Sequence, residues 1–123
     1  MSCLFCSIAN HQIPGDIVYE DDKVVVFRDI NPQAPVHVLI IPKKHIVSIA
    51  DMIDADLPLV AYIMKIAKLV GEKEGLGEKG YRLVINTGPE GGQVIMHLHV
   101  HLLGGRKMPD KMIKTLKLTY LIN

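Results

Sequence analysis

The stretch "MHLHVHLLGG", residues 96–105, places three histidines, His97, His99 and His101, on alternate positions with aliphatic residues between them. Alternation with a period of two is typical of a β-strand, because successive side chains point to opposite faces of the sheet. In such a strand the aliphatic residues enter the core and the three imidazoles stand in a row on the other face. The segment therefore predicts a half-buried strand that carries a row of ring nitrogens.

Outward from this stretch, the sequence predicts further strands and two helices. The runs "IVYED" and "KVVVFRD" are joined by a tight acidic turn, which predicts a hairpin, and "VHVLIIP" at residues 36–42 predicts another strand. Residues 55–74 carry apolar side chains at helical spacing and predict the one long helix. "YRLVINTG" predicts a further strand, and residues 3–11 a short helix. Together these elements predict an α+β domain with a mostly antiparallel sheet.

Composition limits the classes of function. The chain of 123 residues suits one domain over residues 1–123, and its net charge of +1 gives no basic field for nucleic acid. The start "MSCLFCSIAN" has no basic region before its short apolar run, and the longest apolar runs are too short to span a bilayer. We therefore expect a cytoplasmic protein that binds neither nucleic acid nor membranes.

Two cysteines, Cys3 and Cys6, are spaced C-x-x-C. In a reducing cytosol this spacing is more typical of a redox pair or half a metal site than of a structural disulfide. A redox pair usually follows a first strand, whereas only two residues precede this one. That position favours the metal site without excluding the redox pair.

The histidine row itself favours acid–base or nucleophilic chemistry. On a strand, its outer rings would start about 13 Å apart, too far for one zinc ion to bind all three comfortably. A neutral imidazole can attack through one ring nitrogen when a partner holds the other, and we expect a backbone carbonyl as that partner for His99. The glycine-rich "NTGPEGGQ", residues 86–93, can present N–H groups to an anion. A nucleophilic histidine beside such a turn indicates chemistry at phosphorus.

The row "HLHVHLL" resembles the signature of the histidine triad (HIT) family, in which histidines alternate with apolar residues. The segments "FRDINPQAPVHVLIIPKKHI" (residues 27–46), "INTGPEGGQ" and the opening "CLFCSIANHQIPGDIVYED" are similar to that family too. The resemblance implies a HIT fold and a homodimer that hydrolyses purine nucleoside phosphoramidates or related nucleotidyl compounds. The substrate would be an AMP or GMP derivative, and no organic cofactor is implied.

The resemblance also implies roles for individual residues. His99 matches the nucleophile, His101 a ring at the phosphate or bridging atom, His37 a further histidine of the site, and Asp29 the ribose-binding carboxylate. The residues that match phosphate contacts are Asn86, Gly92 and Gln93. The residues that match the lining of the base pocket, and that would otherwise be assigned to the core, are Phe5, Ile8, Phe27 and Ile30. The residues that match a structural zinc site are Cys3, Cys6, His45 and His97.

Two departures from the family pattern bear on the substrate. Val94 stands where many relatives place a small hydroxyl residue, and the tail lacks the tryptophan of the better-studied branch. Two other functions therefore stay open: a nucleotide-binding or scaffold protein without turnover, and a zinc-dependent hydrolase with water as nucleophile. For the homodimer we expect the long helix at or near the axis, because it carries apolar residues beside its main stripe: Ala55, Leu59, Tyr62, Ile66 and Leu69.

Overall fold

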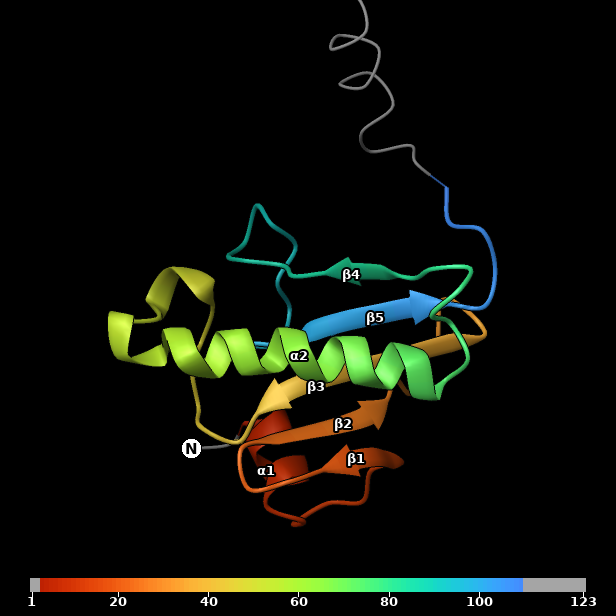
Figure 1. Cartoon of the computed structure of the whole chain (residues 1–123). Coiled ribbons are helices and arrows are strands. Elements are labelled where there is room, and N and C mark those ends of the chain that lie inside the picture. Colours follow the sequence, from red (N-terminus) through yellow and green to blue (C-terminus); the bar gives the residue numbers. More distant parts are fainter. Residues whose placement is uncertain (1–2, 110–123) are drawn as a thin grey trace, which may run out of the picture.

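The computed structural model describes residues 3–109; residues 1–2 and the tail from residue 110 lie outside the description. Figure 1 shows one antiparallel sheet of five strands in the order β1-β2-β3-β5-β4. The strands are β1 (Ile17–Glu20), β2 (Val24–Arg28), β3 (Val36–Pro42), β4 (Arg82–Val84) and β5 (Val100–Gly104). The helices are α1 (Leu4–Ala9) and α2 (Leu57–Lys73), with short 3-10 turns η1 (Ile49–Asp51) and η2 (Asp54–Asp56). The predicted α+β class, with one long and one short N-terminal helix, is confirmed.

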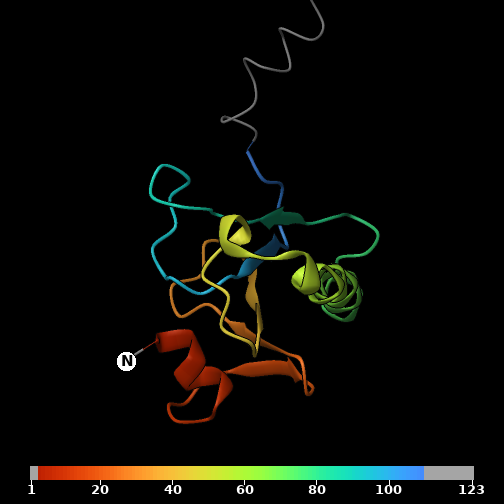
Figure 2. The same ribbon diagram turned by 90° about the vertical axis from the view of Figure 1, so that its left-hand side faces the viewer.

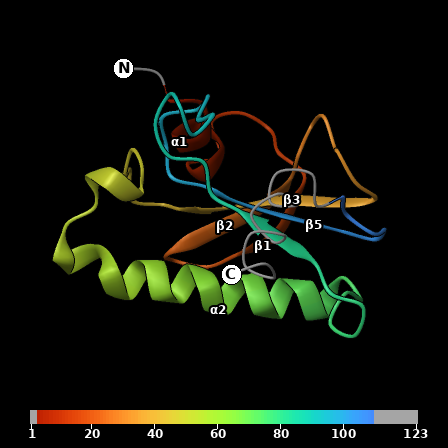
Figure 3. The ribbon, with the colours of Figure 1, turned by 90° about the horizontal axis from the view of Figure 1, so that it is seen from above.

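The two helices cover opposite faces of the sheet. Seen along the sheet in Figure 3, α2 lies on one side, while α1 and the segment between β4 and β5 lie on the other; Figure 2 gives the same arrangement from the end of α2. Strand alternation sends one set of residues to α2, namely Val24, Val26, Val38, Ile40, Val100 and Leu102. The other set packs with α1, namely Val25, Phe27, Leu39 and Ile41.

Helix α2 begins at Leu57, two residues later than predicted, with Pro58 in its first turn, where the missing N–H costs nothing. Our expectation of spare apolar surface on this helix was wrong in part. Ile66 is 3% exposed and belongs to the core, and Ala55 lies in η2 rather than in the helix. Leu69, at 47% exposed, remains on the surface. Within residues 3–109, neither helix combines the length and the apolar character that crossing a membrane requires.

The predicted strand at residues 96–103 is shorter than expected, since β5 begins only at Val100. The predicted half-buried pattern is wrong before the strand: Leu98 and Val100 belong to the core on the α2 side, but His97 and His99 are buried as well, each with its ring against Phe5. The carbonyls of Pro42 and His97 accept hydrogen bonds from imidazole N–H groups. Because these two carbonyls bind imidazoles, they do not take part in hydrogen bonds between the strands that the structure describes. Regular pairing of β5 with β3 starts at Val100, one residue after His99.

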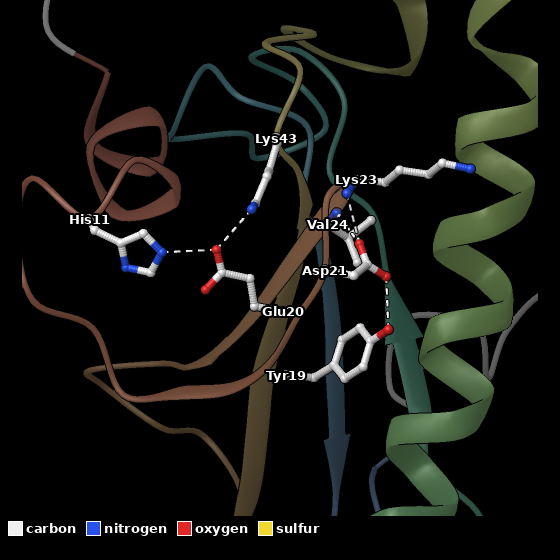
Figure 4. A network of polar contacts seen from close by, with 7 residues as sticks. All are labelled: His11, Tyr19, Glu20, Asp21, Lys23, Val24 and Lys43. Atoms are coloured by element: carbon white, nitrogen blue, oxygen red, sulfur yellow. Dashed lines mark hydrogen bonds and ion pairs between the residues drawn. The ribbon is translucent and has the colours of Figure 1, made fainter.

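Polar contacts within the β1–β2 hairpin converge on Asp21 (Figure 4), and one contact from α2 joins them. Asp21 accepts main-chain hydrogen bonds from Lys23 and Val24, at 2.8 and 2.9 Å, and a hydrogen bond from the Tyr19 hydroxyl at 2.8 Å. The hydroxyl of Tyr62, on α2, donates to the same carboxylate. Partial burial alone would raise the pKa of Asp21, but these donors together lower it to about 2. The carboxylate therefore stays charged at neutral pH and fixes the hairpin against the helix.

Candidate active site along the histidine row

A cavity of about 790 Å³ opens on the α1 side of the sheet. Its apolar wall contains Phe5 and Ile8 of α1, Phe27 of β2 and Leu39 of β3, all of them buried. The ring of Phe5 meets that of Phe27 edge to face, with centroids 5.3 Å apart. An apolar slot with aromatic edges suits a flat heteroaromatic ring.

The structure brings all four predicted apolar residues to this cavity, but not in the same way. Phe5, Ile8 and Phe27 form its buried wall, whereas Ile30 is 92% exposed and lies at the rim. Asp29 also lines the cavity. Its Oδ1 accepts from the Asn31 main-chain N–H at 2.8 Å, and its own N–H donates to the carbonyl of His37 at 2.9 Å. The carboxylate is thus fixed beside the slot.

His99 lines the same cavity with a side chain held by the main chain. Its Nδ1 donates to the carbonyl of His97 at 2.7 Å, which confirms the predicted carbonyl partner. A neutral ring whose Nδ1 carries the proton has a lone pair on Nε2. Phe5 contacts this ring edge-on, with centroids 5.1 Å apart, and limits its rotation. The arrangement leaves one ring nitrogen free to act as a nucleophile.

The rings of His37 and His101, together with Asp29, form a group that we call the relay cluster. Gln33 N–H donates to His37 Nδ1 at 3.0 Å, so the proton of a neutral His37 is on Nε2. That Nε2 lies 3.0 Å from His101 Nδ1 and 3.4 Å from an oxygen of Asp29. His37 therefore donates to His101, whose own proton is left on Nε2. His101 lines the cavity, and His37 stands behind it.

Burial keeps both rings of this cluster uncharged at neutral pH. It lowers the pKa of His37, opposed by the nearby Asp29 carboxylate. Burial, followed by the neighbouring histidines His99 and His37, lowers the pKa of His101 to about 4. A neutral His101 with its proton on Nε2 is a hydrogen-bond donor at the cavity.

A second group, which we call the metal cluster, consists of Cys3, Cys6, His45 and His97, whose ligand atoms all lie within 4.8 Å of one another. His97 Nδ1 lies 3.4 Å from both sulfurs and 3.2 Å from His45 Nδ1. A tetrahedral zinc ion with these ligands sets sulfur–nitrogen and nitrogen–nitrogen separations of about 3.3 to 3.6 Å. The four side chains therefore fit a tetrahedral metal ion.

Two further features of this cluster fit a metal. His97 Nε2 donates to the carbonyl of Pro42 at 2.8 Å, which leaves the lone pair of Nδ1 facing the other three ligands. Burial and then the adjacent Cys3 thiol raise the pKa of Cys6 to about 11. Without a cation this thiol stays protonated at neutral pH, whereas a bound metal would hold the thiolate.

Of the residues that were predicted to contact phosphate in the glycine-rich turn before the row, two line the cavity and one supports the turn from behind. Asn86 and Gly92 line the cavity, and the φ of 71° and 80° at Gly88 and Gly92 suit glycine. Gln93 does not line it. Its buried amide accepts from Gly88 N–H and donates to the carbonyls of Val47 and Ile95, so it braces the turn from behind.

Sequence reasoning missed several groups of the site. Leu39 could have been found, because it lies two positions after His37 on the same face of β3. Val94, by contrast, was singled out from the sequence, and it lines the cavity at 83% exposed. The main-chain N–H of Gln33 and the main-chain carbonyl of Pro42 set the ring tautomers. Every residue has such a carbonyl and every residue except proline has such an N–H, so the residue type does not reveal them.

Comparisons with known proteins agree with this geometry. Residues 10–108 match the HIT domain family. The chain is 46% identical over 105 residues to the purine nucleoside phosphoramidase of Escherichia coli (strain K12), covering 85% of this chain and 88% of that protein. It is 50% identical over 107 residues to the 14 kDa zinc-binding protein of Zea mays, with coverage of 85% and 83%. A crystal structure of a HIT family hydrolase from Legionella pneumophila superposes with a TM-score of 0.87 at 54% identity, covering 89% and 97%.

Proposed function

This chain belongs to the HIT domain family, and we propose that it hydrolyses purine nucleoside phosphoramidates or related nucleotidyl compounds through a nucleotidyl group carried on His99. The observation that carries the proposal is the hydrogen bond from His99 Nδ1 to the carbonyl of His97, because it leaves Nε2 with its lone pair at the cavity. The 46% identity to a purine nucleoside phosphoramidase supports the same reaction class.

The substrate fits the cavity in three parts. The purine enters the apolar slot of Phe5, Ile8 and Phe27, with Ile30 at the rim. The ribose hydroxyls donate to Asp29, and the α-phosphate lies against the turn of Asn86 and Gly92. Binding of this kind holds phosphorus in reach of one ring nitrogen, which is the main contribution an enzyme makes to phosphoryl transfer.

The reaction then proceeds in two steps. His99 Nε2 attacks phosphorus and the P–N bond breaks; its electron pair stays on the bridging nitrogen, which takes up one proton from solvent as the amine leaves. His101, with its proton on Nε2, donates a hydrogen bond to the bridging nitrogen or a phosphoryl oxygen. Water next attacks the nucleotidyl-histidine, which releases the nucleoside monophosphate and returns one proton to solvent.

For the metal cluster we propose zinc in a structural role. Zinc bound there would tie α1 and the residue before it to the loop after β3 and to the start of the histidine row. Four protein ligands fill a tetrahedral site and leave no position for a water nucleophile. His99 is not one of these ligands, so the proposed nucleophile stays free. These features favour the nucleotidyl-histidine over a zinc-activated water.

We also propose that the chain acts as a homodimer. Strand β4 is an edge of the sheet and exposes Leu83, while Ile85 just after it and Leu69 on α2 add apolar surface. We propose that α2 lies at or near the two-fold axis, as expected from the sequence, with the β4 edge beside it, so that the contact covers these side chains. The cytoplasmic location expected from the sequence stays a prediction, and so does the single domain over residues 1–123.

Trapping the covalent adduct tests the proposal. Wild-type protein mixed with an adenosine phosphoramidate and quenched with denaturant at alkaline pH, where a P–N bond to histidine is stable, should gain the mass of an AMP group, mapped to His99 by peptide mass spectrometry. His99→Ala should show no adduct and lose turnover by about 10³-fold or more, as expected when a nucleophile is removed. It should still bind AMP.

A different adduct site, or turnover in His99→Ala at a rate near that of the wild type, would contradict the nucleophile. A wild-type protein that binds AMP tightly without turning over any of the phosphoramidates would instead support the scaffold function. His11→Gln removes an exposed histidine outside both clusters, in contact with Glu20 (Figure 4), and should behave as the wild type.

A further inference from the structure

The sequence "GGR", residues 104–106, comprises the last residue of β5 and the turn after it, and the proposed reaction does not use it. Gly105 has φ +93° and packs so closely on Pro35 that an added Cβ would lie 2.8 Å from the Cβ of that proline. Arg106 Nη2 donates to the carbonyl of Gln33 at 3.0 Å. Two neighbouring residues of one turn therefore hold the same loop, residues 29–35, between β2 and β3.

This loop supplies the group that sets the relay cluster. The N–H of Gln33 donates to His37 Nδ1 at 3.0 Å, and His37 Nε2 lies 3.0 Å from His101 Nδ1. Two sets of hydrogen bonds thus meet at Gln33: its carbonyl accepts from Arg106 on the surface, and its N–H donates to the ring of His37, which contacts His101 at the cavity.

We propose that Arg106 is a positioning residue for the relay cluster. By holding the carbonyl of Gln33 it restrains the backbone of that residue, including the N–H that keeps His37 in the tautomer with its proton on Nε2. Its consequence for turnover rests on the function proposed above, whereas its consequence for the His37 tautomer does not.

Arginine suits this task better than lysine would. Its guanidinium also donates through Nη1 to the carbonyl of Lys107 at 3.2 Å, so one planar group bridges the turn and the loop. A lysine ammonium at this position would be a single flexible point of attachment. Arg106 itself is exposed, so its removal leaves the core unchanged and stability nearly so.

Asp29 belongs to the same loop but is held separately. Its N–H donates to the carbonyl of His37, and its carboxylate accepts from Asn31 N–H. Loss of Arg106 should therefore disturb the proton positions of His37 and His101 more than the carboxylate assigned to ribose. We expect kcat to fall while KM changes little.

The test compares Arg106→Met, Arg106→Lys and Lys107→Met with the wild type. Lys107→Met removes one positive charge from the same turn and leaves the main-chain carbonyl that Arg106 contacts. Long-range ¹H–¹⁵N spectra of the imidazoles report which ring nitrogen carries the proton, and the His37 signals are identified by their loss in His37→Gln. Turnover and KM are measured with an adenosine phosphoramidate, and thermal unfolding checks that each variant is folded.

We expect Arg106→Met to mix the two tautomers of His37 and to lower kcat about tenfold, less than the roughly 10²-fold that a misplacement of 1 Å can cost. Arg106→Lys should recover part of both, and Lys107→Met should match the wild type. A pure wild-type tautomer in Arg106→Met, mixed tautomers with unchanged kcat, or an equal effect in Lys107→Met would each overturn the proposal. If the wild type shows no turnover, the proposed function fails, and the His37 tautomer still decides what Arg106 does.

Discussion

The metal cluster and the relay cluster both take a ring from the same row of histidines, but their rings face opposite main-chain groups. In the metal cluster, the Pro42 carbonyl accepts the Nε2 proton of His97, so the other nitrogen has a free lone pair. In the relay cluster, the Gln33 N–H donates to Nδ1 of His37, so the other nitrogen keeps its proton. Each cluster has three or four potential ligands for a metal, yet only the first presents lone pairs to one point.

The difference shows how the main chain assigns chemistry to identical side chains. A carbonyl on one ring nitrogen makes the other an acceptor, a metal ligand or a nucleophile. An amide on one ring nitrogen makes the other a donor. His99, bonded to a carbonyl, shares the lone-pair state of His97, and His101, bonded to His37, shares the donor state of the relay. The four rings thus divide into two ligand-type and two donor-type groups.

The largest expected effect comes from removing a thiolate from the metal cluster. Cys6→Ser should lose the bound metal, from about one zinc per chain to none. Because structural zinc binds with apparent free energies of about 10 to 16 kcal/mol, the free energy of unfolding should fall by about 3 kcal/mol or more. That corresponds to a decrease of about 10 °C or more in Tm. Elemental analysis and thermal unfolding measure the two effects.

If the two thiols were a redox pair, the contrast between a metal-binding cluster and the relay cluster would not hold. The wild type would then be purified without metal, and its two cysteines would interconvert between dithiol and disulfide with little change in Tm. His11→Gln serves as the control, since its imidazole contacts Glu20 and neither cluster, and its metal content should equal that of the wild type.

A change in the relay cluster should lower turnover and leave the metal content unchanged. His37→Leu removes the donor to His101, and turnover should fall about 10²-fold, at the lower end of the loss that follows removal of a hydrogen-bond donor at a reacting group. The metal content should remain that of the wild type, because His37 contacts no member of the metal cluster among the hydrogen bonds of residues 3–109. Steady-state kinetics and elemental analysis of one preparation separate the two clusters. A parallel loss of metal would show that they are not independent.

Much of this architecture was predictable, because the spacing of apolar side chains along the sequence indicates strands and helices. The alternation of Leu98, Val100 and Leu102 gave the buried face, and the helical spacing gave α2 within two residues of each end. The start of β5 was not predictable, because it depends on carbonyls that accept from imidazoles rather than from a neighbouring strand. The burial of Ile66 likewise depends on how far α2 turns toward the sheet, which spacing alone leaves open.

The sequence indicated which side chains belong to the site, but apart from the carbonyl partner of His99 it did not indicate the main-chain groups that hold them. The resemblance named residues that the fold does bring together, including Cys3 and His97, which are 94 positions apart. The resemblance implied that Gln93 contacts phosphate. In the structure the side-chain amide of Gln93 is hydrogen-bonded to main-chain groups behind the turn. Backbone donors and acceptors exist at nearly every position, so their use is decided by the tertiary structure.

The expected effect that is smallest at neutral pH, and that grows only in weak acid, concerns the charge of the relay cluster. Burial lowers the pKa of His101 from its ordinary 6.5 to about 4, so between these pH values the unfolded chain binds a proton that the folded chain does not. The free energy of unfolding should therefore fall as the pH drops from 6.5 toward 4, and His101→Gln should show a shallower fall. Urea unfolding at stepped pH values measures both proteins, and contributions common to them, such as acid release of a bound metal, cancel in the difference. Parallel curves would mean that His101 titrates alike in the folded and unfolded chains. The relay would then carry a positive charge in weak acid, and the contrast with the metal cluster would rest on its hydrogen bonds alone.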